Sequence, residues 1–392
     1  MGGRLNAETY EVGGQAGAAW AAEAVAQLAA MENVTLMPRT TVTGAHDGGT
    51  FGALERVAHH GPRPRGGVKE TFWRIAARRS ILAAGALERH IAFRDNDRPG
   101  VMMGASVRAY LNRWGVAPGR EIAVFTNNDD GHRTACDLVD AGVHVVAVID
   151  SRDEAEAQGD YRVIAGGRVS RAMGRRGLEA IEVTGEGAEF KLAVDCLAVS
   201  GGWNPTVHMT CHMNGRPTWD AGIASFVPTP GAVPGMVTAG ACNGAFSTRR
   251  CLEEGAQAAD ESLAALGMTS PEGAVPEAED TPYAIAPLWA VEGTGRAWLD
   301  FQNDVTVKDV KQAAVENYAS VEHMKRYTTQ GMATDQGKNS NVAALAILAD
   351  ATGRGIPETG TTTFRPPYTP IALAALGAGA QGKGFAPERK TT

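Results

Sequence analysis

The fold class is decided by the stretch Glu121-Ile-Ala-Val-Phe-Thr-Asn-Asn-Asp-Asp-Gly-His132. Together with the residues that follow, it predicts a strand over 121–125, a polar turn over 126–131, a helix over 132–141 and a strand over 143–149 that ends in Asp150. A strand, a helix and a second strand in this order form a βαβ unit. The sequence therefore predicts an α/β fold with a Rossmann-like domain near its middle.

The turn after the first of these strands differs from the glycine-rich loop that binds dinucleotides. In GxGxxG the first two glycines let the backbone approach a pyrophosphate at the N-terminus of a helix. Here the six positions read Thr-Asn-Asn-Asp-Asp-Gly over 126–131, so only Gly131 remains. Asp129 and Asp130 place negative charge where an anion needs a positive field. We therefore expect this unit to have the Rossmann-like fold without binding a nucleotide.

Composition excludes several classes of protein. The 392 residues are 44% hydrophobic and 21% charged, which predicts a globular protein of two or three domains. A net charge of −7 argues against binding to nucleic acid. No apolar run reaches the roughly 18 residues of a membrane span, and no signal-peptide pattern is visible. Five cysteines without a Cys-x-x-Cys pair indicate a reducing compartment, so we expect a cytoplasmic protein.

Two glycine-containing strand ends are candidates for cofactor contact. Ser80-Ile-Leu-Ala-Ala-Gly-Ala-Leu-Glu88 resembles a strand end that recurs in flavoproteins with two dinucleotide-binding domains, where small residues pass close to the cofactor. The alternative is a tight turn with Gly85 at positive φ. Val237-Thr-Ala-Gly-Ala-Cys-Asn243 resembles a later Ala-Gly-Asp segment of the same flavoproteins, with Ala241 in place of the acid. The residues expected to line the cofactor cavity are Ala84, Gly85, Ala86 and Gly240.

Other clusters of polar residues give weaker indications. His208, Cys211 and His212 have the spacing of ligands on one helix face, but Asn204-Pro205 favours a loop or short helix, and the sequence indicates no fourth ligand, so no metal is predicted. Gly331 to Ser340 resembles a phosphate loop, but five residues separate its glycines. Lys338 and the N–H groups of the following helix still suit one phosphate or carboxylate. No catalytic residue is predicted, because no Ser-His-Asp or Cys-His arrangement is visible.

Several longer stretches together resemble the alpha subunit of heterotetrameric sarcosine oxidase. They are long and idiosyncratic, and their order and spacing extend over nearly all of the chain. The stretches are Asn96-Asp-Arg-Pro-Gly-Val-Met102, Val124-Phe-Thr-Asn-Asn128, Ser200-Gly-Gly-Trp-Asn-Pro-Thr-Val-His208, Asp300-Phe-Gln-Asn-Asp-Val-Thr-Val-Lys-Asp309, Glu322-His-Met-Lys-Arg-Tyr-Thr-Thr329, Asp335-Gln-Gly-Lys338 and Thr361-Thr-Thr-Phe-Arg-Pro-Pro-Tyr368.

The resemblance implies a subunit of an enzyme that demethylates sarcosine to glycine, with hydrogen peroxide and either formaldehyde or 5,10-methylenetetrahydrofolate as products. In that family the amine is oxidised at an FAD on the beta subunit. Electrons pass to an FMN at the alpha/beta interface, the alpha subunit carries NAD, and gamma and delta subunits complete the complex. On this basis Lys338, Thr362 and Arg365 are expected to contact an anion or the flavin near a subunit boundary, because they combine donors, positive charge and loop positions.

The resemblance also implies that the sequence is a central fragment. A strand with an intact GxGxxG is expected before Gly2, and an aminomethyltransferase-like, folate-binding domain after Lys390. Two alternatives stay open: a subunit of a related heteromeric amino-acid or opine dehydrogenase, and a truncated scaffold without catalysis. The related dehydrogenases tend to carry a four-cysteine iron–sulfur module, and residues 285–392 contain no cysteine, which favours sarcosine oxidase.

This interpretation divides the chain into five parts. Residues 1–115 are expected to form an incomplete first dinucleotide-binding domain, into which a second Rossmann-like domain is nested at 116–196. Its last residues, 190–199, read as one buried strand. Residues 197–268 return to the first domain, and the Pro- and acid-rich residues 269–284 are expected to be a linker. Residues 285–392 are expected to be a helical module with an extended, glycine-rich tail.

Overall fold

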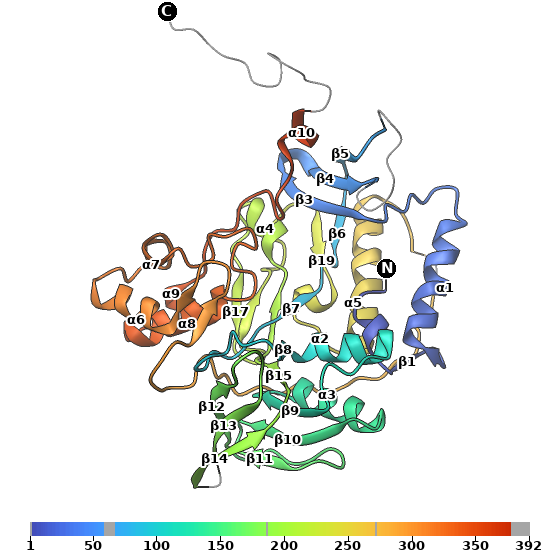
Figure 1. Cartoon of the computed structure of the whole chain (residues 1–392). Helices are drawn as coiled ribbons and strands as arrows, with labels where there is room; N and C mark the ends of the chain where they lie inside the picture. The colour runs from blue at the N-terminus through green and yellow to red at the C-terminus, as the bar shows by residue number, and fades with distance from the viewer. Residues whose placement is uncertain (1, 59–66, 186, 271–272, 378–392) are drawn as a thin grey trace, which may run out of the picture.

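The computed structural model describes residues 2–58, 67–185, 187–270 and 273–377 and contains a five-stranded parallel sheet, seen in the lower part of Figure 1. The strand order is β11-β10-β9-β15-β8, formed by Val163–Ala165, His144–Asp150, Glu121–Thr126, Cys196–Ser200 and Val101–Met103. Helix α3 (Asp129–Asp140) connects β9 to β10. The predicted βαβ unit is confirmed, and its observed bounds lie within a few residues of the predicted ones.

Both faces of this sheet are covered, as parallel strands require. On one face, Phe125 and Ile149 pack against an antiparallel sheet whose strands are β12 (Arg168–Met173), β13 (Ala180–Gly185) and β14 (Ala188–Ala193). On the other face, Ile122 and Val148 pack against α3, α2 (Gly104–Arg108) and the π-helical turn Ala109–Arg113. The sheet interior is therefore fully buried.

The prediction of one strand over 190–199 is wrong. The chain leaves the antiparallel sheet after Ala193 and enters the parallel sheet at Cys196. Asp195 holds this crossing, because its carboxylate accepts the backbone N–H groups of Arg120 and Glu121 at 2.9 and 3.0 Å. The sequence pattern missed the break because residues on both sides are apolar and suit a strand.

The remaining α/β elements lie around a small parallel pair. Strand β6 (Ser80–Leu82) pairs with β19 (Met236–Thr238), and helices α5 (Thr248–Ala265) and α1 (Gly17–Ala29) lie on the same side of the molecule (Figure 1). The other elements of this region are the 3-10 turns Gly3–Ala7, Asp47–Gly49 and Gly240–Asn243, α4 (His208–His212), β1 (Glu11–Val12), β2 (Gln15–Ala16), β3 (Thr40–His46), β4 (Thr50–Arg56), β5 (Glu70–Ala76), β7 (Ala86–Glu88), β16 (Trp203–Pro205), β17 (Thr218–Asp220) and β18 (Ser225–Val227).

The C-terminal part is a helical module, packed at one side of the α/β elements (Figure 1). Helix α8 (Asn341–Ala351) is apolar on every side and is buried at the module's centre. Around it lie β20 (Trp298–Asp300), β21 (Val305–Thr306), α6 (Val307–Val315), α7 (Val321–Thr328) and α9 (Ile356–Thr359). Helix α10 (Leu373–Gly377) lies apart from them, beside β5 (Figure 1). The predicted glycine-rich tail lies outside the described residues from 378 onward.

The predicted linker runs along the surface of the α/β elements in its described part, 273–284. Its backbone bonds to other segments, since Gly13 N–H donates to the Glu277 carbonyl at 2.7 Å and Arg249 N–H to the Glu279 carbonyl at 3.3 Å. Ser247 Oγ donates to the Asp280 carboxylate at 2.6 Å. No helix in the described ranges is long and apolar enough to cross a membrane.

Candidate functional site

Three of the predicted cofactor residues lie together where β6 and β19 end. The Ala239 N–H donates to the Leu82 carbonyl at 3.0 Å, which brings Ala84 and Gly85 beside Gly240. We call residues 83–85 and 239–240 the first edge. Ala86 lies just beyond it, at the start of β7. The structure thus brings together strand ends that are more than 150 positions apart in the sequence.

The first edge has room for close approach of a ligand. Gly85 has φ +72°, and a Cβ atom placed on it meets nothing within 4 Å. Gly240 has φ +74°, and its Cβ position meets only the Cys251 side chain. Positive φ at both positions favours glycine; Gly85 is half-buried, whereas Gly240 is buried. Gly85 therefore leaves room for a ligand to approach its backbone closely, and a cofactor contact at these residues stays a prediction.

The polar groups at the first edge are already organised by helix α5. Glu254, on this helix, accepts the N–H of Gly240 at 3.0 Å and the side-chain amide of Asn243 at 3.1 Å. Cys242 Sγ donates to the Leu82 carbonyl at 3.0 Å, and burial raises the pKa of this thiol. Cys242 therefore acts as a structural residue, because the thiolate that nucleophilic chemistry needs is disfavoured.

We call residues 127–131, 150–152 and 200–202 the second edge; they follow β9, β10 and β15. Here the side chains do not fit a dinucleotide. Asn128 Oδ1 accepts the Asp130 N–H at 3.0 Å and caps α3. A Cβ atom on Gly131 would lie 2.3 Å from Thr126, so this glycine serves helix–strand packing, the role of the third glycine in GxGxxG.

A buried negative charge also makes the second edge unsuitable for a dinucleotide phosphate. Asp130 is buried; burial alone would raise the pKa of its carboxyl group, but the positive charges of Arg4 and Arg133 outweigh burial and lower the pKa to about 2. Trp203 Nε1 also donates to this carboxylate. A permanent anion therefore lies beneath the helix N-terminus where a phosphate would have to bind.

Asp150 ends β10, where an acid holds the ribose in dinucleotide-binding domains. Its fully buried carboxylate accepts hydrogen bonds from His132 Nε2 at 2.8 Å and from Arg152 Nη2 at 2.7 Å. Burial opposes ionisation, yet these two partners hold the pKa of Asp150 below its usual value. Because Asp150 is committed to protein partners, it is not available to a ribose.

The sequence analysis missed two buried ionisable residues after β7. Glu88 accepts the N–H of Ala105 at 2.7 Å, and burial raises its pKa to about 7. Arg89 donates to the carbonyls of Gly201 and Trp203 and to Asn204 Oδ1, at 2.8 to 3.2 Å, and burial lowers its pKa to about 10. The signal was the Glu-Arg-His run, which is flanked by apolar residues on both sides.

The other predicted contacts lie between α4, the loop before α8 and residues 361–368. Lys338 Nζ donates to the carbonyls of Asp335 and Tyr368 at 2.7 and 2.8 Å. Thr362 is buried and accepts from Asn341 Nδ2 at 3.1 Å, whereas Arg365 is exposed. Two carbonyls leave Lys338 one further N–H to donate. The three residues therefore share a region but not a common ligand-facing surface.

His208 is the notable side chain in this region. Its ring lies 4.0 Å from the Phe364 ring and 5.1 Å from the Tyr368 ring, centroid to centroid. Both ring nitrogens are buried without a hydrogen-bond partner, and burial lowers the pKa to about 3. The ring is therefore neutral. The described residues contain no group of three His, Cys, Asp or Glu side chains placed to hold a metal ion.

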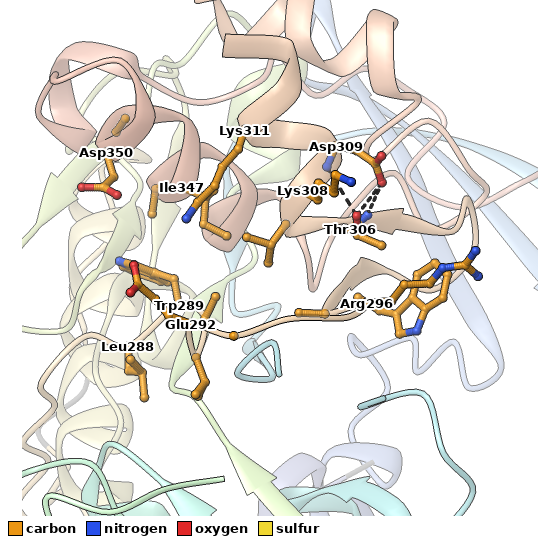
Figure 2. A pocket seen from close by; sticks show the side chains of 18 of the residues that line it. Leu288, Trp289, Glu292, Arg296, Thr306, Lys308, Asp309, Lys311, Ile347 and Asp350 are labelled. Atoms are coloured by element: carbon orange, nitrogen blue, oxygen red, sulfur yellow. Dashed lines mark hydrogen bonds between the residues drawn. The ribbon is translucent and has the colours of Figure 1, made fainter. Parts of the chain in front are cut away.

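A hollow of about 1490 Å³ lies between residues 287–298 and the helices α6, α8 and α9. Figure 2 shows Lys308, Lys311 and Asp309 of α6 above the segment that carries Trp289 and Glu292. Asp309 is used in the capping box with Thr306. No buried polar side-chain atom without a partner lines this hollow in the described ranges, so nothing prepares it for a specific polar ligand.

Comparison with known sequences identifies relatives along the whole chain. A family model described as the sarcosine oxidase A3 domain matches residues 294–380. The sarcosine oxidase subunit alpha of Rhizobium meliloti (strain 1021) is 45% identical over 100% of this chain and 40% of its own length. That of Corynebacterium sp. (strain P-1) is 39% identical over 100% of this chain and 43% of its own length. The chain thus spans less than half the length of these curated relatives.

A solved structure confirms the fold class. The crystal structure of L-proline dehydrogenase from P. horikoshii superposes with a TM-score of 0.73, covering 95% of this chain and 72% of that chain, at 19% sequence identity. At this identity the likeness concerns the fold alone. The predicted α/β fold, of the flavoprotein-like class with FAD/NAD(P)-binding domains, is therefore confirmed.

Proposed function

We propose that this chain, homologous along its whole length to sarcosine oxidase alpha subunits, is part of a subunit of an enzyme that oxidises the CH–NH group of sarcosine. The products are glycine, hydrogen peroxide and either formaldehyde or, with tetrahydrofolate, 5,10-methylenetetrahydrofolate. The 45% identity over every part of the chain carries this proposal. The chain supplies binding surfaces and no catalytic side chain.

The cofactor assignment follows from the two edges. We assign NAD to the first edge, because the Cβ position of Gly85 is open there and the second edge does not fit a dinucleotide. The remaining N–H of Lys338 and the exposed cation of Arg365 suit an anionic group, so FMN at a boundary with the beta subunit is assigned to that region. FAD and the sarcosine site belong to the beta subunit, and gamma and delta subunits complete the assembly.

The test is sarcosine-dependent peroxide formation by the native assembly. The chain is tagged in its own cells and purified gently, and peroxide is measured with sarcosine, with glycine and with L-proline. Peroxide from sarcosine alone, abolished by catalase, supports the proposal. Oxidation of L-proline in place of sarcosine, followed with an added electron acceptor, indicates the related heteromeric dehydrogenase.

The cofactor assignment has its own readout. Flavin absorbance and released nicotinamide are quantified in the same preparation, together with the co-purified subunits. A preparation without flavin, nicotinamide or partner chains indicates a scaffold without catalysis and contradicts the proposed function.

A further inference from the structure

Residues 282–286 of the chain lie in the crevice at the second edge. The Ala286 N–H donates to the Asn127 carbonyl at 3.0 Å, and the Asp129 N–H donates to the Ala284 carbonyl at 3.2 Å. Between them, Asn128 and Ile285 form an antiparallel bridge. The segment therefore pairs with the β9–α3 turn as a short added strand, at the carboxyl ends of parallel strands where α/β folds bind their ligands.

Side chains fasten this segment from both sides. The Ala284 N–H donates to Asp129 Oδ2 at 2.7 Å, and Arg152 Nη1 donates to Asp129 Oδ1 at 2.6 Å and to the Ala284 carbonyl at 3.2 Å. Arg133 Nη2 donates to the Pro282 carbonyl. The negative charge of Asp129 predicted that no phosphate binds here, and in the structure its carboxylate accepts a backbone N–H. The Asp129 N–H, which a phosphate oxygen would use, binds a carbonyl oxygen.

The space left beside the segment does not suit a nucleotide either. A hollow of about 750 Å³ remains there, lined by Arg152 and His132. Its acids are Asp129, Asp153, Glu154 and Glu156. His132 and Arg152 are already bonded to Asp150, so the uncompensated charge of the hollow is negative and repels phosphate groups.

We infer that the 282–286 segment is the resident occupant of this crevice, so that the Rossmann-like unit binds the chain's own connection to the helical module in place of a dinucleotide. Arg152 is the positioning residue, because it joins Asp150, Asp129 and Ala284. The inference concerns a different site from the one proposed for NAD and does not depend on the substrate.

A reversible lock tests the inference. Opposed residues of an antiparallel pair have Cα atoms about 4.5–5.5 Å apart, within the range that a disulfide spans. Asn128→Cys and Ile285→Cys are introduced together into the natural full-length protein in its assembly, and each alone as a control. NAD+ and ADP-ribose binding is measured by calorimetry on the oxidised and the reduced double variant.

We expect the disulfide to form readily and both forms to bind each probe with affinities that agree within about twofold. The inference is overturned if oxidation weakens the binding of either probe about tenfold or more. Such a loss would show that a dinucleotide must enter this crevice. If the two cysteines do not form a disulfide, the inference is also overturned, because residues 282–286 then do not lie in the crevice. If neither form binds a nucleotide, the inference stands and the proposed NAD assignment fails.

The role of Arg152 is tested by limited proteolysis. We expect Arg152→Ala to raise the rate of cleavage by a glutamyl endopeptidase after Glu277 and Glu279 at least fivefold, and Arg152→Lys to restore part of the protection. Glu154→Ala, which removes an exposed acid of the same hollow, is the matched control. Equal cleavage of Arg152→Ala and Glu154→Ala contradicts the role given to Arg152, and far-UV circular dichroism confirms that each variant is folded.

Discussion

Both edges are formed by the carboxyl ends of parallel strands, but they differ in the residues that cover these ends. At the first edge, the Cβ position of Gly85 has no atom within 4 Å, whereas Gly240 is buried beside Cys251. At the second edge, the ends of β9, β10 and β15 are closed by the 282–286 segment and by the Asp150–Arg152 pair. Local residues therefore decide whether the carboxyl ends of parallel strands stay open, as at Gly85, or are covered by the chain itself.

The comparison also shows where each edge gains its stability. The second edge depends on hydrogen bonds to the buried carboxylate of Asp150, which accepts from Arg152 and His132. The first edge depends on backbone conformations that only glycine adopts without strain. Substitutions should therefore damage stability at the second edge and ligand binding at the first.

The largest effect is expected for Asp150→Ala. This change removes the fully buried acceptor of both His132 and Arg152; Arg152 keeps Asp129, so the cost is that of the lost charge-assisted hydrogen bonds, about 3 kcal/mol of unfolding free energy. Urea unfolding measures the loss. Glu154→Ala, an exposed acid nearby, should change stability by less than about 0.5 kcal/mol. Equal losses in the two variants would show that the second edge is not held by this pair.

A pH effect is expected for Glu88. Its pKa is raised from 4.5 to about 7, so the folded state binds a proton more tightly than the unfolded state. Stability is therefore lost as pH rises from below 5 to above 7, by about 3 kcal/mol at most. Glu88→Gln removes this dependence. Urea unfolding of both proteins at pH 5 and pH 8 checks the sign, and a parallel pH dependence of the two contradicts it.

The opposite dependence is expected for His208. Its pKa is lowered from 6.5 to about 3, so the unfolded state binds the proton more tightly. The stability that the neutral ring contributes is lost as pH falls from 6.5 toward 3. His208→Phe keeps an aromatic ring and should lose less stability than the natural protein between pH 7 and pH 5, by about 2 kcal/mol. Thermal unfolding at the two pH values measures the difference.

A smaller effect separates strain from ligand binding at the first edge. Gly85→Ala places a methyl group where the proposed NAD passes, and we expect its affinity in the native assembly to fall roughly tenfold, about 1.4 kcal/mol. Gly187→Ala is the matched control, because Gly187 has a similar φ of +75° and equally open surroundings in a hairpin turn. Both variants should lose similar stability. If both also keep full affinity, the first edge is not the cofactor site.

The smallest effects are expected at the helix caps of the two regions. Asn128 caps α3 at the second edge, and Ser247 caps α5 behind the first. Replacing either with alanine should cost about 1 kcal/mol. Asn128→Ala should cost more, because its amide also donates to the buried Ser200 carbonyl at 2.9 Å. Chemical unfolding of the two variants ranks them, and Asn128→Asp, which keeps the cap acceptor, should recover part of the loss.

Much of the fold was predictable because it depends on local patterns. The strand–helix–strand run after Arg120 has an apolar strand, a capping asparagine and a second apolar strand in sequence, and each signal acts within a few residues. The same method failed at 190–199, where Asp195 separates two strands of different sheets. A polar residue within an apolar run carries no mark that distinguishes a sheet crossing from a solvent-facing strand position.

The candidate site was predictable only in part. The open Cβ position of Gly85 agrees with a small residue at a strand end, but residue type alone does not show which glycines are open, since Thr126 fills the Cβ position of Gly131. The sequence did not predict that Lys338 donates to two carbonyls or that Thr362 accepts from Asn341. Backbone carbonyl groups are the same in every residue, so the sequence does not show which side chain they will meet.

The sequence by itself determined the βαβ unit, the family resemblance and the absence of a phosphate-binding loop at 126–131. The tertiary structure alone decided what fills the crevice that this loop leaves. Ala284 reaches Asp129 and Arg152 across 155 and 132 positions of the sequence, largely through backbone groups. Contacts of this kind leave no pattern in the sequence, because they depend on where folding places the chain and not on which residues it carries there.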